Sequence, residues 1–168
     1  MDESDIRRFL DESYPKVVGA VALVAGDLAT AEDAVQEAIV RAWERRDRGD
    51  RIDDLEPWVA TVAMNLSRSR LRHLRVERRA RPRLVAAATT DGPSGDAIDV
   101  RRALATLPRR QREAAVLRFY LDRTTEEIAS AMGTSHGTVK SQLAKARAHL
   151  ADALDVPDGE KESRNADV

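Results

Sequence analysis

The chain has 168 residues, enough for one large domain or two small ones, and only 4% of its residues are aromatic. Its formal net charge is −1, yet acids and bases are strongly segregated along the chain. It has no cysteine, which excludes disulfides and thiolate metal sites, and its three histidines form no ligand cluster, so we expect no metal and no cofactor. No apolar run approaches the roughly 18 residues that span a bilayer, and the first residues have no secretory apolar region. We therefore expect a cytoplasmic protein without membrane insertion.

Apolar periodicity predicts a first helical segment over residues 4–25, in which Ser4 can cap the start. Ile6, Phe9, Leu10 and Tyr14 are predicted to form one apolar stripe. Pro15 predicts a kink or a fresh first turn, because proline lacks the backbone N–H that a helix interior needs. The pair Gly26 and Asp27 is expected to end the segment.

The clearest amphipathic helix is predicted over residues 30–46, with Thr30 as its cap and Asp33 three residues later. Its inner face is predicted to hold Val35, Ala38, Ile39, Ala42 and Trp43. Its outer stripe is Asp33, Gln36, Glu37, Val40 and Glu44. Between Asp27 and Glu37 there are four acids and no base, so the net charge is 0 − 4 = −4. Helix capping explains part of this charge, and a surface for a partner would explain the rest.

A loop is expected over residues 47–55, and Pro57 suits the first turn of the next helix. The weak helix formers between Asn65 and Ser69 predict a break or a short loop there. From Met64 to Arg83 the chain has eight arginines and one acid, Glu77, so the net charge is 8 − 1 = +7. A block this basic is typical of phosphate binding.

Periodicity is lost over residues 80–98, where the run TTDGPSGD has the composition of a linker. A helix is predicted from Ile98, and Pro108 is expected to begin the next one. The tail beyond Leu154 is polar and acidic, and we expect residues 157–168 to be disordered.

Residues 124–150 have the pattern of a helix-turn-helix. Thr124 or Thr125 can cap its first helix, with Glu127 or Glu126 completing a capping box. Gly133 lies where the first helix must stop, and Thr134 or Ser135 can cap the second. The second helix has an apolar stripe and a cationic, polar outer face, which suits a DNA major groove. Its exposed candidates for phosphate and base contacts are Thr138, Lys140, Ser141, Gln142, Lys145 and Arg147. An ordinary helical hairpin with a solvated basic face is the alternative for this segment alone.

Two blocks together resemble the bacterial RNA polymerase sigma factors of the extracytoplasmic-function (ECF) family. The first comprises AEDAVQEAIVRAW at residues 31–43 and PWVATVAMNLSRSRLRHLR at residues 57–75, and it is similar to the sigma2 domain. The second, from Leu107 to Arg147, is similar to the sigma4 domain. The resemblance covers residues 4–154. It implies an all-α fold of two small helical domains, a sigma2-like domain over 1–79 and a sigma4-like domain over 98–156, joined by a flexible linker at 80–97.

The resemblance also implies roles for individual residues. Asp33, Gln36 and Glu37 match the positions that dock on the clamp of the largest polymerase subunit. The positions that hold and open the −10 promoter element are matched by Val62, Asn65, Leu66, Ser67, Arg68, Arg72 and Arg75. The −35 element is expected to meet the recognition helix at the six positions from Thr138 to Arg147 listed above. Many relatives have arginine where this chain has Gln142, so the usual −35 preference is not carried over there.

The resemblance implies a promoter-specificity subunit that is not an enzyme. Its expected partners are core RNA polymerase, through the clamp and flap regions, promoter DNA and an anti-sigma factor, and we expect a monomer when the chain is free. No nucleophile–base pair, metal-ligand spacing or glycine-rich phosphate loop points to catalysis. The alternative is a conventional dimeric helix-turn-helix regulator with an N-terminal sensor or dimerisation domain. A dimerisation domain needs neither the acidic stripe nor the +7 block, so we favour the sigma factor.

Overall fold

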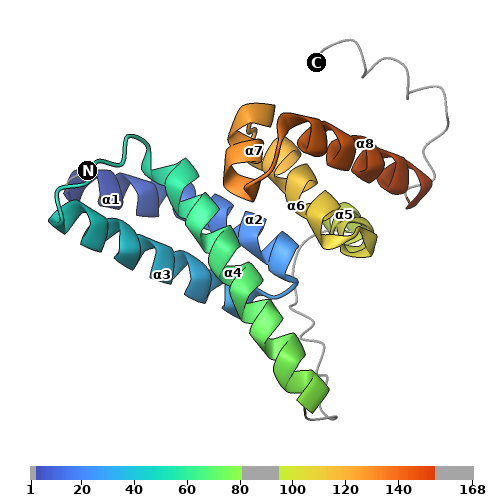
Figure 1. Ribbon diagram of the computed structural model, residues 1–168, viewed down its shortest axis with the longest axis horizontal. Helices are drawn as coiled ribbons and strands as arrows, with labels where there is room; N and C mark the ends of the chain where they lie inside the picture. Colours follow the sequence, from blue (N-terminus) through green and yellow to red (C-terminus); the bar gives the residue numbers. More distant parts are fainter. Residues whose placement is uncertain (1–2, 81–94, 154–168) are drawn as a thin grey trace. The chain divides into compact units, whose positions relative to one another are not determined.

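The computed structural model describes residues 3–80 and 95–153, and in these ranges every regular element is helical (Figure 1). Its contacts separate two compact units, one built on α1–α4 and one on α5–α8. The first unit contains α1 (Glu3–Arg8), η1 (Phe9–Ser13), α2 (Tyr14–Ala25), α3 (Leu28–Asp47) and α4 (Leu55–Ala80). The second contains α5 (Gly95–Thr106), α6 (Arg109–Ala115), α7 (Thr125–Met132) and α8 (His136–Ala153), and the π-helical turn η2 (Val116–Tyr120) follows α6 in the chain. The predicted all-α class is confirmed.

The kink predicted at Pro15 takes the form of a π-helical turn, η1. The backbone N–H of Tyr14 donates to the carbonyl of Phe9, five residues back, and α2 starts with Pro15 in its first turn. A wider turn before a proline relieves the clash between its ring and the carbonyl four residues earlier. α2 then ends at Gly26 with φ at 92°, a left-handed conformation that glycine adopts without steric cost.

The core of the first unit is formed where α2, α3 and α4 pack against one another (Figure 1). The inner face of α3 consists mostly of small side chains, all fully buried: Ala31, Ala34, Val35, Ala38 and Ala42. Small residues let three helices approach closely, which holds the outward face of α3 at a fixed orientation.

The N-cap of α3 is Asp27, and not Thr30 as the sequence had predicted. The helix starts at Leu28, and the carboxylate of Asp27 accepts a hydrogen bond of 3.0 Å from the backbone N–H of Thr30. Asp27 is therefore the cap, and Thr30 belongs to the first turn. This change leaves Asp33 free of any capping role.

The predicted break between Asn65 and Ser69 is wrong, because α4 is continuous from Leu55 to Ala80. The Ser67 hydroxyl donates to the Met64 carbonyl at 2.9 Å, and this satisfies a polar side chain that is completely buried. A serine that bonds back to its own helix does not need to leave the helical conformation.

In the second unit, α5, α6 and α7 all pack against α8. Ile128 and Met132 of α7 and Val139, Leu143 and Ala146 of α8 are buried, whereas Leu150, expected on the same stripe of α8, is partly exposed. α5 begins at Gly95, inside the range expected for the linker, while residues 81–94 and the predicted tail lie outside the described residues.

Arginine side chains close the exposed ends of two helices in this unit. Arg112 donates to the carbonyls of Ala105 and Leu107 at 2.7 and 3.1 Å, at the end of α5. Burial lowers the pKa of Arg112, because the charged guanidinium loses contact with water. Arg110 donates to the carbonyl of Met132 at 3.2 Å, at the end of α7. These contacts satisfy carbonyls that a helix terminus leaves unpaired.

Candidate nucleic-acid interface

The outward face of α3 is acidic and open to solvent. Asp33 and Gln36 are exposed, and the Glu37 carboxylate accepts from Arg41 Nε at 3.0 Å, one turn later on the same helix. Val40 continues this face with 54% of its surface exposed. The three predicted docking residues therefore share one accessible face, and an exposed apolar side chain extends it.

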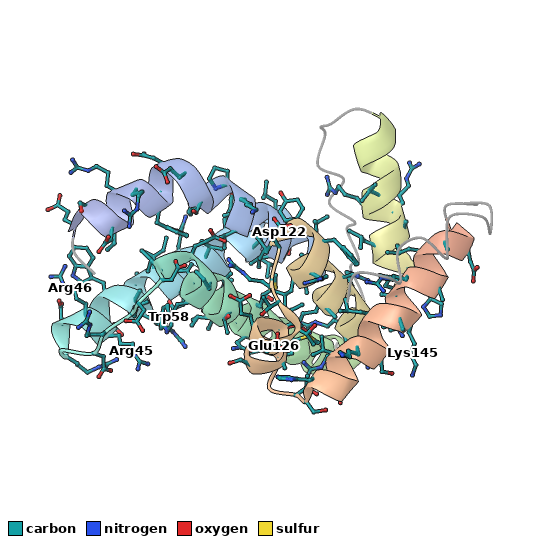
Figure 2. The ribbon with its side chains drawn as sticks, turned by 90° about the horizontal axis from the view of Figure 1, so that it is seen from above. Arg45, Arg46, Trp58, Asp122, Glu126 and Lys145 are labelled. Carbon is teal, nitrogen blue, oxygen red and sulfur yellow. The ribbon has the colours of Figure 1, made fainter. Side chains whose placement is uncertain are left out.

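Trp43 departs from its predicted place in the inner stripe of α3. The indole is 38% exposed, and the guanidinium carbon of Arg46 lies 4.3 Å from its ring centroid. Ala42, which was predicted to share the inner stripe, is fully buried. Arg45 and Arg46 extend from the C-terminal end of α3 (Figure 2). The apolar part of the α3 face thus includes Val40, as the predicted outer stripe indicated, and Trp43, which periodicity had placed on the inner stripe.

The predicted −10 residues lie on α4 with unequal accessibility. Asn65 is exposed, while Val62, Leu66 and Arg68 are partly exposed. Arg72 and Arg75 belong to α4, but their side chains lie outside those the structure describes. Ser67 does not join the others, because its side chain is buried and its hydroxyl is bonded to Met64. The prediction that Ser67 contacts DNA is therefore wrong, and this residue packs in the core of the first unit.

The helix-turn-helix forms as its pattern predicted. Thr124 caps α7 in a reciprocal box with Glu127, and Gly133 ends the helix at φ 60°. The Ser135 hydroxyl then accepts from the backbone N–H of Thr138 at 3.2 Å, which caps α8. The turn between α7 and α8 is thereby defined at both ends, and it sets the angle at which α8 leaves.

The outer face of α8 is polar and cationic. Thr138, Lys140, Ser141 and Lys145 are exposed, and Gln142 and Arg147 are partly exposed. Figure 2 shows Lys145 projecting from α8. The Thr138 hydroxyl lies 2.9 Å from that of Ser135, so it is engaged in the cap as well. All six predicted residues lie on α8 and are at least partly accessible to solvent.

A polar contact that sequence reasoning missed holds α8 in place. His149 Nδ1 lies 2.8 Å from Gln111 Oε1, which joins α8 to α6. This pair has no sequence signal, since its partners come together only when the helices pack. A second pair lies within α6, where the buried carboxylate of Glu113 is 3.8 Å from Nη1 of Arg110, three residues earlier.

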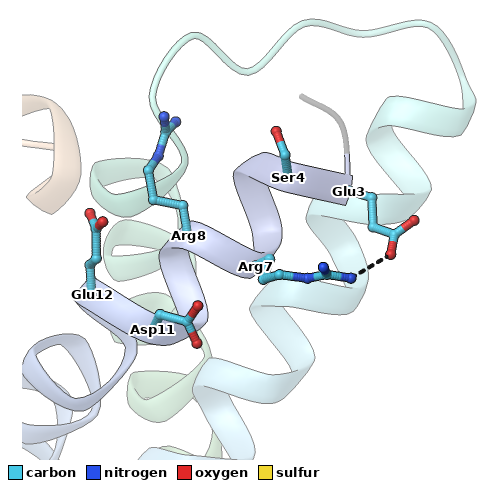
Figure 3. A pocket seen from close by; sticks show the side chains of 6 residues that line it. All are labelled: Glu3, Ser4, Arg7, Arg8, Asp11 and Glu12. Carbon is cyan, nitrogen blue, oxygen red and sulfur yellow. Dashed lines mark hydrogen bonds and ion pairs between the residues drawn. The ribbon is translucent and has the colours of Figure 1, made fainter.

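Among the described residues, no group of three or more acidic or histidine side chains is suited to a metal ion. A shallow, open depression is lined by Glu3, Ser4, Arg7, Arg8, Asp11 and Glu12 (Figure 3). Its charges are exposed and partly paired, with Arg7 3.0 Å from Glu3 and Arg8 2.9 Å from Asp5. Exposed pairs of this kind contribute little to stability.

Within the helices that the structure describes, no segment is both long and apolar enough to cross a membrane.

Comparison with known families matches both halves of the chain. Residues 9–77 match the Sigma-70 region 2 family, and residues 97–150 match the Sigma-70, region 4 family. The chain is 32% identical over 155 residues to the ECF RNA polymerase sigma factor SigL of Mycobacterium tuberculosis, with 84% of each chain covered. It is 32% identical over 141 residues to the ECF RNA polymerase sigma factor EcfG of Rhodopseudomonas palustris, covering 82% of this chain and 78% of that protein.

A longer relative and a solved structure extend these matches. The probable RNA polymerase sigma factor RfaY of Xanthomonas campestris is 32% identical over 149 residues, which cover 82% of this chain but 37% of that protein. The chain thus spans little more than a third of this relative. The sigma factor RpoE of Bartonella quintana, solved in complex with the anti-sigma factor NepR, superposes with a TM-score of 0.79 at 26% identity. That match covers 90% of this chain and 98% of the other.

Proposed function

Because the chain belongs to the ECF family of RNA polymerase sigma factors, which direct polymerase to promoters, we propose that its two units divide docking, strand opening and −35 recognition between them. One observation carries this proposal. The exposed face of α3 is acidic, whereas the exposed face of α8 is cationic and polar. Opposite charges on separate helices suit a protein that binds both a protein partner and DNA.

Asp33, Gln36 and Glu37 supply the docking contact with the clamp of core polymerase. Their side chains are accessible, and two carboxylates on one face attract a cationic partner surface. Val40 and Trp43 add exposed apolar area beside them, and aromatic side chains are enriched at interface centres. We place the second contact, with the polymerase flap, on the α5–α8 unit.

The −10 element is opened along α4. Asn65 is an exposed amide that can donate to and accept from the edge of an unstacked base, flanked by Val62 and Leu66. Arg68, Arg72 and Arg75 hold the phosphates of the displaced strand. Extruding a base costs a few kcal/mol of stacking, which contacts to the single strand must offset.

The −35 element is read in the major groove by α8. Lys140, Lys145 and Arg147 bind phosphates, and Ser141 and Gln142 reach base edges, while Thr138 lies at the N-terminal end of the same face. The domain limits that follow from these roles are 1–79 and 98–156. Polymerase supplies the catalytic site, so the chain itself is not an enzyme and acts in the cytoplasm as a monomer.

An anti-sigma factor is the remaining partner we propose. The RpoE chain that superposes on this one was solved with such a protein. A partner that covers the acidic face of α3 would block polymerase, which is the simplest way to hold the factor inactive.

The test is reconstitution with purified core polymerase, followed by selection of promoters from a random DNA pool. We expect the holoenzyme to enrich a pair of elements at −10 and −35 spacing. Asp33→Lys should abolish binding to core, whereas Asp11→Lys, an exposed acid of η1, should not. A chain that forms a stable dimer by light scattering and binds duplex DNA without polymerase would instead be a conventional regulator.

A further inference from the structure

An ion pair connects the docking helix with the helix that opens DNA. Arg70 Nη1 of α4 lies 3.4 Å from Asp33 Oδ2 of α3. Three further pairs of α3 are local: Glu37 with Arg41, Arg45 with Asp50, and Arg46 with Asp47. Asp33 and Arg70 are far apart in sequence, and only the packing of α3 on α4 brings them together (Figure 1).

Both side chains of this pair remain accessible. Asp33 is 68% exposed and Arg70 is 39% exposed, so the pair is neither sealed in the core nor needed to neutralise a buried charge. An exposed pair joined by one contact at this distance is weak and exchanges readily for other partners. A competing charged group that binds Asp33 or Arg70 more strongly can therefore break this ion pair.

The two residues are attracted to different ligands. Asp33 belongs to the acidic face of α3, which attracts cations of a protein partner. Arg70 lies in the arginine-rich block of α4, which attracts phosphates. In the isolated protein each charge is partly neutralised by the other. Occupying Asp33 with a cationic group therefore makes the Arg70 guanidinium available to DNA.

We propose that Arg70 couples polymerase docking to strand binding by exchanging Asp33 for a DNA phosphate. This inference rests on the proposed function, since it takes α3 as the docking helix and α4 as the strand-binding helix. Coupling of this kind is reciprocal, so a bound strand favours docking by the same factor as docking favours the strand. The energy of an exposed pair limits that factor to about fivefold.

The experiment measures binding of the full-length, polymerase-free chain to a labelled single-stranded oligonucleotide of mixed sequence, by fluorescence anisotropy at several salt concentrations. Asp33→Asn should raise the affinity by about two- to fivefold, because it releases Arg70. Glu32→Gln, which removes a neighbouring exposed acid, is the matched control and should have a smaller effect. The double variant Asp33→Asn with Arg70→Ala should lose the gain. Arg70→Ala alone should change the affinity of the free chain little.

A second arm repeats the titration with reconstituted holoenzyme. There Arg70→Ala should reduce the slope of log affinity against log salt by about 0.7, the value for one phosphate of a single strand. Equal gains from Glu32→Gln and Asp33→Asn would overturn the proposal, as would a gain that survives in the double variant. Core-polymerase binding by Asp33→Asn is measured separately. If that binding is unchanged, the docking assignment fails, whereas the coupling is judged by the DNA titrations.

Discussion

Thr124 and Glu127 satisfy each other's backbone at the start of α7. The Thr124 hydroxyl accepts from the Glu127 N–H at 3.2 Å, and the Glu127 carboxylate accepts from the Thr124 N–H at 2.7 Å. Either of two threonines and either of two glutamates fitted the sequence pattern, and the structure uses this pair. The box fixes the first residue of α7 and so the position of the turn that leads into α8.

The stabilising contribution of Glu127 to the second unit should be lost in acid. The hydrogen bond from the Thr124 N–H lowers the pKa of Glu127 below its ordinary value of about 4.5. A carboxylate with a lowered folded-state pKa contributes stability above its unfolded value, and that contribution is lost as pH falls through the folded value. Urea unfolding between pH 7 and pH 3 should show this loss in the wild type and a smaller one in Glu127→Gln.

Glu126→Gln is the control for this measurement, because it removes an acid from the same turn without touching the box. Its acid-side loss should match that of the wild type. Thr124→Ala removes the hydroxyl partner and should cost about 1 kcal/mol at neutral pH. Superimposable pH curves for Glu127→Gln and Glu126→Gln would contradict the role assigned to Glu127.

Substitution of Gly133 should lower the stability of the second unit because of its backbone conformation alone. Its φ is 60°, and a Cβ built there would meet no atom within 4 Å. Gly133→Ala should therefore destabilise the unit by about 1–2 kcal/mol, the cost of a left-handed conformation for a residue with a Cβ. Thermal unfolding measures the change, and Gly133→Asn should be milder.

Gly137, four residues later, should accept a side chain without loss of stability. It lies in the first turn of α8, and a Cβ there would come no nearer than 4.0 Å to Ser135 Oγ. Gly137→Ala should leave stability unchanged or raise it by up to about 1 kcal/mol, since alanine favours helix over glycine. If Gly133→Ala and Gly137→Ala lower the stability equally, the left-handed φ of Gly133 is not the reason for its cost.

Periodicity and glycine positions predicted most of the helices, because apolar spacing and left-handed ends are local properties. α2 ends at Gly26 and α7 at Gly133, as the sequence indicated. The choice among adjacent caps was less certain, as at α3, where Asp27 replaced Thr30. Several neighbouring residues have suitable oxygens, and packing of the helix on its partners selects one of them.

The accessibility of individual site residues depended on tertiary packing. The family resemblance placed Ser67 in the −10 site, but its side chain is buried and bonds to Met64. Trp43 fitted the inner stripe, but it is 38% exposed, whereas its neighbour Ala42 is fully buried. The contact between Arg70 and Asp33 joins two helices, so no spacing within either one could have revealed it.

Asn65→Ala should weaken strand opening more than association with duplex DNA. Asn65 is exposed on α4, and its proposed partner is a base edge that exists only after the base leaves the stack. Loss of one such hydrogen bond should cost roughly 1 kcal/mol, about a fivefold decrease in open complex. Permanganate footprinting measures opening, and mobility shift measures association at low temperature.

Ser69→Ala, one turn further along α4, provides the control and should affect both assays little. Equal losses in opening and association for Asn65→Ala would count against a role on the unstacked base. They would instead indicate a contact with the intact duplex.

Gln142→Arg should change which −35 sequence is preferred rather than lower affinity for all sequences. Gln142 is partly exposed on the outer face of α8, and its amide can pair two ways with adenine, whereas arginine pairs with two acceptors of guanine. A good bidentate pair discriminates by about 1–3 kcal/mol, so one position of the selected element should move from adenine toward guanine. Lys145→Ala is the matched control on the same face, because loss of a phosphate contact should weaken all sequences about equally and lower the salt slope by about 1. Selection from a randomised promoter pool with each holoenzyme measures both effects. If the wild type and Gln142→Arg return the same element, Gln142 does not read a base, and α8 recognises the −35 region through its other side chains.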